Sequence, residues 1–364
     1  MFIKIKPIDT LFFRTARPFS KGEDTWADLV FPPYPSTLYG AIRSYLIFKN
    51  GTLKDFYNGK FKDILGTPEE KAKFSIKGPL LISEEKPIFK VPNDLIKVKG
   101  NDKKLYPLQF CKKPFLMVSN YNFDNAIVWK EKEVIDDAEG WLSSLYFKNY
   151  LTGKSKEFYY GKNDDYFQRE EKIGITRDKV SKTSKDECLY RMSMIRLKKN
   201  VGFVAEIENI NNLGKNGVLQ LGGESKAVAF EECDDIFKDL KDIEFKFNEN
   251  LFKIYLATPA IFKKGWLPGW IEESSLKGNY NGIEVKLLAC AIGKPIPIGG
   301  WKLNAGGGKP KPLKKAVPSG SIYYFKVLND ADANKIKDVF HFKNISDINP
   351  EEGFGLSIVG VVMI

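Results

Sequence analysis

Residues 1–14 read MFIKIKPIDTLFFR, and residues 32–46 read PPYPSTLYGAIRSYL. Apolar residues alternate and then run together through the first segment, which predicts a strand that ends at Arg14. The prolines of the second segment forbid a helix before Ser36, a residue type favoured at helix N-caps. Apolar residues then recur at helical spacing, at Leu38, Ile42, Tyr45 and Leu46. We therefore expect the chain to open as a strand, a long loop and a helix.

Strand patterns return in the second half of the chain. Met192–Leu197 and Val201–Ile207 are two apolar runs separated by three polar residues, which predicts a pair of neighbouring strands. Further strands are expected at 227–230, 251–258, 284–292, 321–327 and 357–363, with a short amphipathic helix at 330–340. Residues 218–221 fit either the end of a helix or a strand. Each half fits a small antiparallel sheet backed by helices, the ferredoxin-like (RRM-like) α+β arrangement of RNA-recognition modules.

Composition changes along the chain suggest where these modules begin and end. Residues 234–242 form a charged connector, so we expect an N-terminal domain over 1–235 and a C-terminal domain over 245–364. The segment 84–170 is rich in Asn, Lys and aromatic residues and contains one short helical pattern near 139–150. We interpret it as an irregular insertion in the first domain that acts as a lid.

The net charge is uneven. The 364 residues include 57 Lys and Arg against 46 Asp and Glu, a formal charge of +11. Two windows, 172–200 and 294–315, each carry a net +6, so the rest of the chain is nearly neutral. Clustering of this kind favours an electrostatic footprint for phosphates over a generally solvated lysine-rich surface.

Several functional classes are disfavoured by composition. The 43% hydrophobic content argues against disorder, and no stretch offers a membrane-spanning run or a signal peptide, so we expect a cytoplasmic protein without membrane contact. The four cysteines never form a C-x-x-C pair, and His341 is the only histidine, so we expect no metal site. Neither a P-loop nor a dinucleotide fingerprint is present, so we expect no cofactor.

Glycine-rich motifs and nearby cations are the candidate binding elements. Glycine lets backbone N–H groups approach phosphate oxygens closely, although each such motif is also compatible with a simple turn. Prolines stiffen the Lys309–Pro312 segment, and Trp301 offers a stacking surface, although an exposed linker has the same composition. The candidate RNA-binding residues are Arg14, Arg17, Lys21, Arg177, Lys182, Gly222, Gly223, Lys226, Gly299, Gly300, Trp301, Lys302, Lys309, Lys311, Gly353 and Gly355.

Two of these clusters have equally good structural interpretations. Arg14, Arg17 and Lys21 follow the first predicted strand, where arginine can pair with phosphate or stack on a base, or can be held by Asp9 or Asp24. The cluster around Arg177 and Lys182 precedes a strand and could clamp a nucleic-acid backbone or order the lid.

Taken in order, several of these motifs resemble the third Cmr subunit of type III-B CRISPR effector complexes. The resemblance covers almost the whole chain except 84–170, and it is carried by Asp9–Arg14, Arg17–Phe19, Pro35–Arg43, Ile173–Asp178, Leu189–Tyr190, Leu221–Ser225, Gly299–Trp301, Lys311–Pro312 and Val317–Ser321. It implies a repeat-associated (RAMP) protein with two ferredoxin-like domains and glycine-rich loops. It also implies a non-catalytic role: gripping the 5′ repeat-derived tag of the CRISPR RNA and docking the large polymerase-like subunit and a backbone RAMP subunit.

Other functions remain open at this point. One is a metal-independent endoribonuclease that matures CRISPR RNA, in which His341, Tyr or Lys would perform the proton transfers. A second is the equivalent subunit of a type III-A complex, whose motifs are closely similar. A third is a protein scaffold whose lysines face acidic neighbouring subunits.

Overall fold

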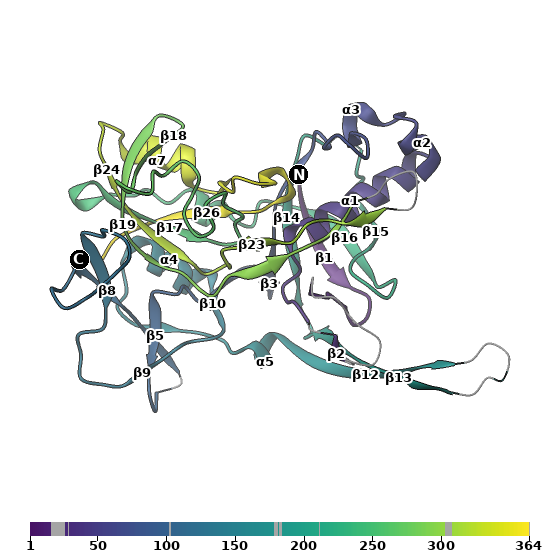
Figure 1. The fold of residues 1–364 in the computed structure, drawn as a ribbon, viewed down its shortest axis with the longest axis horizontal. Helices are drawn as coiled ribbons and strands as arrows, with labels where there is room; N and C mark the ends of the chain where they lie inside the picture. The colour runs from purple at the N-terminus through teal and green to yellow at the C-terminus, as the bar shows by residue number, and fades with distance from the viewer. Residues whose placement is uncertain are drawn as a thin grey trace. The chain divides into compact units, whose positions relative to one another are not determined.

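The computed structural model describes residues 1–15, 26–27, 29–101, 103–177, 181, 184–210, 212–302 and 308–363, and for 26–27, 175–177 and 184–190 it gives the backbone. The chain is mixed α/β and rich in sheets (Figure 1). It forms two compact units: the first comprises residues 1–79, 164–233 and 297–314, and the second comprises 80–163, 234–296 and 315–364. This division differs from the expected boundaries at 1–235 and 245–364, because segments far apart in sequence pack together.

The first unit is built on an antiparallel sheet in the order β3-β14-β1-β16-β15. Its central strand β1 is hydrogen-bonded to β14 on one side and to β16 on the other. The helix α1 lies against this sheet beside β15 (Figure 1). The elements of this unit are β1 (Phe2–Pro7), β2 (Trp26–Ala27), α1 (Pro35–Asn50), α2 (Leu53–Tyr57), α3 (Lys62–Leu65), β3 (Ser75–Ser83), α5 (Asn163–Tyr166), β12 (Phe167–Arg177), β13 (Ser184–Leu197), β14 (Val201–Glu208), β15 (Asn216–Gln220), β16 (Ala227–Cys233), β21 (Trp301–Lys302) and β22 (Lys309–Pro310).

The start of α1 differs from the expectation. The helix begins at Pro35, with Tyr34 as N-cap and no side-chain capping bond, so the predicted cap at Ser36 is wrong. Proline at the first helical position has a fixed φ suited to the helix and lacks an N–H that would need a partner. The predicted apolar face is confirmed, because Leu38, Ile42 and Leu46 are buried.

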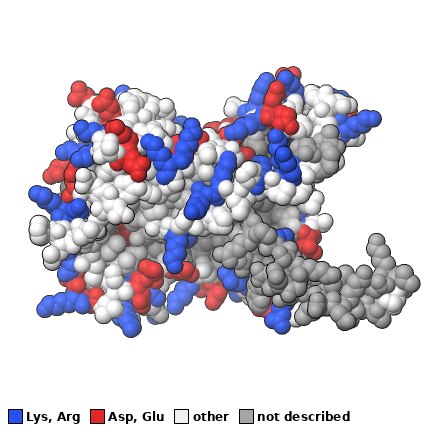
Figure 2. Space-filling model, in the orientation of Figure 1, with Lys and Arg blue, Asp and Glu red and all other residues white. Residues whose placement is uncertain are grey.

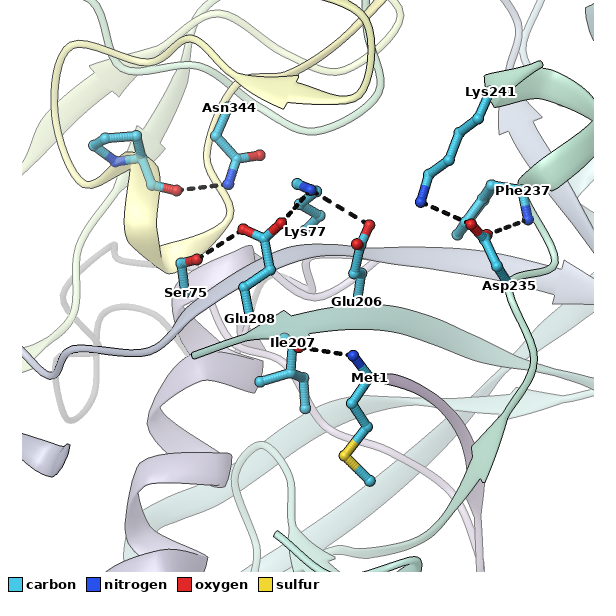
Figure 3. A network of polar contacts seen from close by, with 11 residues as sticks. Met1, Ser75, Lys77, Glu206, Ile207, Glu208, Asp235, Phe237, Lys241 and Asn344 are labelled. Carbon is cyan, nitrogen blue, oxygen red and sulfur yellow. Dashed lines mark hydrogen bonds and ion pairs between the residues drawn. The ribbon is translucent and has the colours of Figure 1, made fainter. Parts of the chain in front are cut away.

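An ion-pair cluster ties β3 to β14 within the first unit. Lys77 on β3 lies 3.4 Å from a carboxylate oxygen of Glu206 and 2.5 Å from one of Glu208, both on β14 (Figure 3). The hydroxyl of Ser75 donates to the other oxygen of Glu208 at 3.1 Å. Lysine is thus used here to hold two strands together.

The second unit contains an antiparallel sheet in the order β18-β19-β24-β17-β26-β25, with several small sheets around it. Strand β3 passes into this unit, where its last residues pair with β4. The elements are β4 (Lys86–Lys90), β5 (Leu95–Val98), β6 (Lys104–Pro107), β7 (Gln109–Lys112), β8 (Asn125–Val128), β9 (Ile135–Asp136), β10 (Trp141–Ser143), α4 (Ser144–Thr152), β11 (Phe158–Tyr159), α6 (Lys238–Lys241), β17 (Leu251–Leu256), β18 (Lys277–Tyr280), β19 (Ile283–Ala291), β24 (Ile322–Val327), α7 (Ala333–Phe340), β25 (Lys343–Asn344) and β26 (Leu356–Val361). Two short paired strands, β20 (Ile296–Ile298) and β23 (Lys314–Ala316), include residues of both units.

Helices cover both faces of this sheet. Alternate residues of β17 point to opposite faces. Tyr255 packs on Phe147 of α4 with ring centroids 4.8 Å apart, whereas Phe252 packs on Phe340 of α7 with centroids 5.7 Å apart. Gly360 suits the close approach of α4, since a Cβ there would make a tight contact of 3.3 Å with the backbone of Leu151.

The segment 84–170 is more regular than predicted. It contributes strands β4 to β11 and helix α4, the last displaced from the helical pattern expected near 139–150. Phe89, Phe147 and Tyr150 are buried in the core of the second unit. Interpreting the whole segment as an irregular lid is therefore wrong, because its aromatic residues are core residues.

A buried polar network lies between α4 and the sheet of the second unit. The Lys253 ammonium is 3.4 Å from the Asp94 carboxylate, and both side chains are at most 2% exposed. The hydroxyls of Tyr150 and Tyr324 donate to Asp94 at 2.7 and 2.5 Å, and the Lys253 ammonium lies 3.5 Å from the Tyr150 ring centroid. Burial lowers the pKa of Lys253, and burial followed by the Asp94 charge raises the pKa of both tyrosines.

The strands predicted in the second half of the chain are present as β13 to β17, β19, β24 and β26, and the helix expected at 330–340 is α7. Within the described part of the chain, no helix is both long and apolar enough to cross a lipid bilayer.

Candidate nucleic-acid interface

The first unit contains a pocket lined by residues that follow β1. Strand β1 ends at Pro7, so the strand predicted to run to Arg14 is shorter than expected. Beyond β1, Leu11 exchanges backbone hydrogen bonds with Ile195, which keeps the chain extended. This places Phe12 and Phe13 on the pocket wall, where both side chains are buried. The Phe13 carbonyl accepts from the N–H of Val30, another wall residue, at 2.9 Å.

A glycine turn forms the next part of the wall. Gly222 has φ +86°, and a Cβ there would lie 2.4 Å from the carbonyl oxygen of Phe12. The N–H of Gly223 donates to that same oxygen at 2.9 Å, and a Cβ on Gly223 would lie 2.8 Å from the Phe12 ring. The two glycines are therefore needed for the turn to approach Phe12.

Helix α1 supplies the opposite wall with small and polar residues. They recur at helical spacing on the side of α1 away from its apolar stripe, at Thr37, Gly40, Ala41 and Ser44. Arg14, Tyr34 and Gln220 complete the lining of a pocket of about 440 Å³. Arg14 is exposed, so its guanidinium is accessible from solvent.

This combination of groups suits one nucleotide of a single strand. Aromatic rings stack on bases, guanidinium pairs with phosphate, and hydroxyl and amide groups can read the edge of a base. Burial raises the pKa of Tyr34 to about 12, so its hydroxyl stays protonated at neutral pH. That hydroxyl donates to the carbonyl of Pro297 at 3.2 Å.

The contact with Pro297 connects the pocket wall to the segment 297–311. Trp301 and Lys302 pair with Lys309 and Pro310 in a two-stranded ribbon. The Lys311 N–H donates to the Gly300 carbonyl at 2.8 Å. Trp301 is 57% exposed and Lys309 and Lys311 are exposed, whereas Lys302 pairs with Glu69 at 2.6 Å. The ribbon thus presents an indole and two ammonium groups to solvent, and Gly299 lies at its start.

Lys226 is held in an ion pair. Its ammonium lies 3.0 Å from one oxygen of Asp9, and Arg196 lies 3.3 Å from the other. Arg196 also pairs with Glu170 on the facing strand. The hydrogen bond from Lys226 is the main cause that lowers the pKa of Asp9 to about 2, so the carboxylate stays charged at neutral pH. Lys226 of the glycine turn and Arg196 of the basic window 172–200 are thus both paired with carboxylates of the same chain, those of Asp9 and Glu170.

The strands β12 and β13 carry part of the basic window as a long antiparallel hairpin (Figure 1). Arg177 ends β12, and its backbone is described. Arg17, Lys21 and Lys182 lie outside the described residues. On the described surface around β18, β19 and α4, basic side chains are interspersed with acidic ones (Figure 2).

Gly353 and Gly355 belong to the second unit and are buried there. The Gly353 carbonyl accepts from the Thr258 hydroxyl at 2.7 Å, and the Gly355 N–H donates to the Pro259 carbonyl at 2.7 Å. A Cβ on Gly355 would lie 2.5 Å from the backbone nitrogen of Ser346. These contacts give both glycines a packing role.

His341 is also part of the second unit's core. Its Nε2 lies 2.9 Å from the Leu240 carbonyl, and its Nδ1 accepts from the Val359 N–H at 3.1 Å. Burial lowers its pKa to about 4. A 6% exposed imidazole with both nitrogens on backbone partners is unsuited to act on a bound RNA.

The sequence analysis missed the α1 wall of the pocket. The spacing of Thr37, Gly40, Ala41 and Ser44 is visible in the sequence, but small and polar residues at that spacing are also typical of a solvent-exposed helix face. Two other features have no signal in the sequence. One is the position of Gln220 in the pocket, and the other is the pairing of Asp9 with Lys226, which are more than 200 residues apart.

Comparison with known proteins gives a consistent result. A family model described as CRISPR-associated protein (Cas_Cmr3) matches residues 3–362. The CRISPR system CMR subunit Cmr3 of Saccharolobus solfataricus is 24% identical over 264 residues, which are 71% of this chain and 71% of that protein.

Two solved chains share the fold. One comes from a cryo-EM structure of the type III-B Cmr-beta complex bound to cognate target RNA and AMPPnP, with a TM-score of 0.52, 20% identity and coverage of 89% of this chain and 86% of that chain. The other comes from Cmr-beta bound to cognate target RNA, with a TM-score of 0.52, 19% identity and the same coverage.

Proposed function

Because the chain belongs to the Cmr3 family of CRISPR-associated proteins, we propose that it is the RNA-binding subunit of a type III-B Cmr complex that anchors the 5′ tag of the CRISPR RNA in antiviral defence. The named relative is a CMR subunit, and both similar solved chains come from complexes with target RNA. We extend membership of a Cmr complex and binding of RNA from these proteins to this chain.

One observation carries the residue-level part of the proposal. Arg14, the Gly222–Gly223 turn and the base of the 297–311 segment meet around one pocket in the first unit. A tag nucleotide would place its base against the phenyl rings and a phosphate at Arg14. The next phosphates would run to Lys309 and Lys311, with Trp301 as a stacking surface.

We also propose that each unit contains a ferredoxin-like RAMP core. Support comes from the strand order, in which the second core strand lies beside the third, the third beside the first and the first beside the fourth. In the first unit these strands are β1, β3, β14 and β16, and in the second they are β17, β19, β24 and β26. The first strand of each set is antiparallel to both neighbours, as this arrangement requires.

The proposed role is non-catalytic and cytoplasmic, with the large polymerase-like subunit and a backbone RAMP subunit as protein partners. The burial of His341 argues against the endoribonuclease alternative. Incubating the protein with repeat RNA in chelator tests this point, since site-specific cuts would overturn the non-catalytic role.

Tag binding is tested with the full chain and two RNAs that differ only in the 5′ tag. We expect Arg14→Ala to weaken binding of the tagged RNA about tenfold. The double variant Lys309→Glu/Lys311→Glu should lower affinity and make the salt dependence shallower by about two phosphate contacts. Lys343→Glu, which changes an exposed lysine of the second unit, is the matched control. Equal affinity for both RNAs, or no effect of Arg14→Ala, would contradict the proposal.

A further inference from the structure

The hairpin of β7 and β8 in the second unit carries an exposed apolar loop. Residues 114–118 read Pro-Phe-Leu-Met-Val. Phe115 is 100% exposed, Leu116 89%, Met117 44% and Val118 93%. Isolated exposed apolar residues are ordinary, but four in succession at the tip of a hairpin are unusual in a protein that works alone.

The loop is held out from the body of the unit by contacts at its base. The Met117 N–H donates to the Pro114 carbonyl at 3.0 Å and closes the turn. Farther along, the Tyr121 ring packs edge-on against Trp266 with centroids 4.9 Å apart, and its hydroxyl donates to Glu273 at 3.3 Å. Asp124 forms an ion pair with Lys286 on β19. The base is thus fixed, while the apolar tip projects into solvent.

We propose that residues 114–118 are a docking tip that inserts into an apolar groove with an acidic rim on another protein subunit of the complex. This inference rests on the proposed function, because it assumes that the chain works in a multiprotein assembly. The four side chains expose on the order of 500 Å² of apolar surface, a large part of one partner's share in a stable protein interface.

The chemistry of the loop favours protein over other occupants. Three of its four exposed side chains are aliphatic, and aliphatic groups do not stack on bases as the aromatic platforms of single-strand binders do. Lys112 and Lys113 flank the tip, which is why the rim of the groove should be acidic.

Assembly of the complex tests the docking tip. The full chain is co-expressed with the other subunits of its own complex and a guide RNA, as wild type and as Phe115→Ser/Leu116→Asn/Val118→Asn. We expect the triple variant to be retained in the purified complex at least tenfold less than wild type. Leu145→Asn on α4, which removes a single apolar side chain that is 64% exposed, should be retained like wild type.

Two further measurements separate this inference from tag binding and from misfolding. The isolated triple variant should bind tagged RNA and unfold thermally like wild type, because the substituted side chains are exposed and the pocket residues belong to the first unit. In the wild-type chain, amide hydrogen exchange at 113–120 should slow on assembly with the protein subunits. If tag binding fails in wild type but assembly still requires the tip, the proposed RNA function falls and the docking tip stands.

Other outcomes would overturn the docking tip. Full retention of the triple variant, or unchanged hydrogen exchange at 113–120 in the complex, would show that no subunit covers the loop. A homodimer of the free chain that the variant abolishes would identify a second copy as the occupant. Binding of wild type to vesicles of anionic phospholipid, lost in the variant, would identify a membrane.

Discussion

A lysine forms an ion pair with an aspartate in two regions of this molecule, and the two pairs differ in burial. In the second unit, Lys253 and Asp94 are buried together with two tyrosine hydroxyls. In the first unit, Lys226 and Asp9 pair at the protein surface beside the pocket, where Asp9 is 57% exposed. The buried pair lies between a helix and a sheet, whereas the surface pair holds a lysine that the sequence offers as an RNA-binding candidate.

The difference shows why clustered charge in a sequence is an incomplete guide to a binding site. Both basic windows contain lysines or arginines that hold carboxylates of the same chain, as Arg196 holds Glu170 and Lys302 holds Glu69. A cation already paired at the surface must exchange one anion for another, so its net contribution to RNA affinity is reduced. Arg14 is a better candidate than Lys226 because it lines the pocket, and Lys309 is a better candidate because it is exposed on the ribbon.

The largest expected effect comes from breaking the buried pair. Lys253→Met leaves the Asp94 charge buried without its cation, so we expect a loss of about 3–5 kcal/mol in the free energy of unfolding. The double variant Lys253→Met/Asp94→Asn removes both charges and should recover part of that loss. Chemical denaturation measures both. A single variant as stable as wild type would mean that the tyrosine hydroxyls alone stabilise the carboxylate.

His341 is another buried titratable group of the second unit, and its contribution to the free energy of unfolding should depend on pH. Its pKa of about 4 lies below the ordinary value of 6.5, so the folded state favours the neutral imidazole. The stability that this provides is complete above about pH 6.5 and is lost as the pH falls toward 4, by about 3 kcal/mol. His341→Gln cannot titrate and should show a flatter stability profile between pH 6.5 and 4. If wild type and His341→Gln lost the same free energy of unfolding between pH 6.5 and 4, the lowered pKa of His341 would be contradicted.

The glycine turn in the pocket wall gives a smaller effect. Gly222→Ala puts a methyl group near the Phe12 carbonyl in a backbone conformation that L residues avoid, so we expect a loss of about 2 kcal/mol. Gly59 is the matched control, because it also has positive φ, at +77°, but nothing lies within 4 Å of its Cβ position. Gly59→Ala should cost about 1 kcal/mol and leave RNA binding intact. Equal losses would mean that the contact with Phe12 is unimportant.

Local patterns in the sequence predicted much of the sheet framework. Alternation located β13, β14 and β16, and the apolar spacing of Leu38, Ile42 and Leu46 located α1, because these signals depend only on neighbours. The core role of 84–170 was missed, since its short strands and aromatic residues are recognisable as core only when the partners in 234–296 and 315–364 are known.

The candidate site was predicted in part for a similar reason. The Gly222–Gly223 turn and Arg14 are marked by residue type, and the structure brings them together at one pocket. The glycines at 353 and 355 carry the same sequence signal but pack against Thr258 and Pro259. A glycine in the sequence indicates that another group packs closely against the backbone. Whether that group is a ligand or another part of the chain depends on the fold.

The smallest expected effect tests the surface pair itself. Asp9→Asn removes the carboxylate that holds Lys226 and one contact of Arg196, and it should leave stability at neutral pH unchanged, because exposed ion pairs contribute little. The released ammonium would then be free to pair with phosphate, so affinity for tagged RNA should rise a few fold and its salt dependence should steepen by about one phosphate contact. Asp63→Asn, which breaks another exposed pair of the first unit with Lys73, should change neither quantity. Weaker RNA binding by Asp9→Asn would mean instead that Asp9 orients Lys226 toward the RNA. Asp9 would then contribute to the binding site and would not compete with phosphate for Lys226.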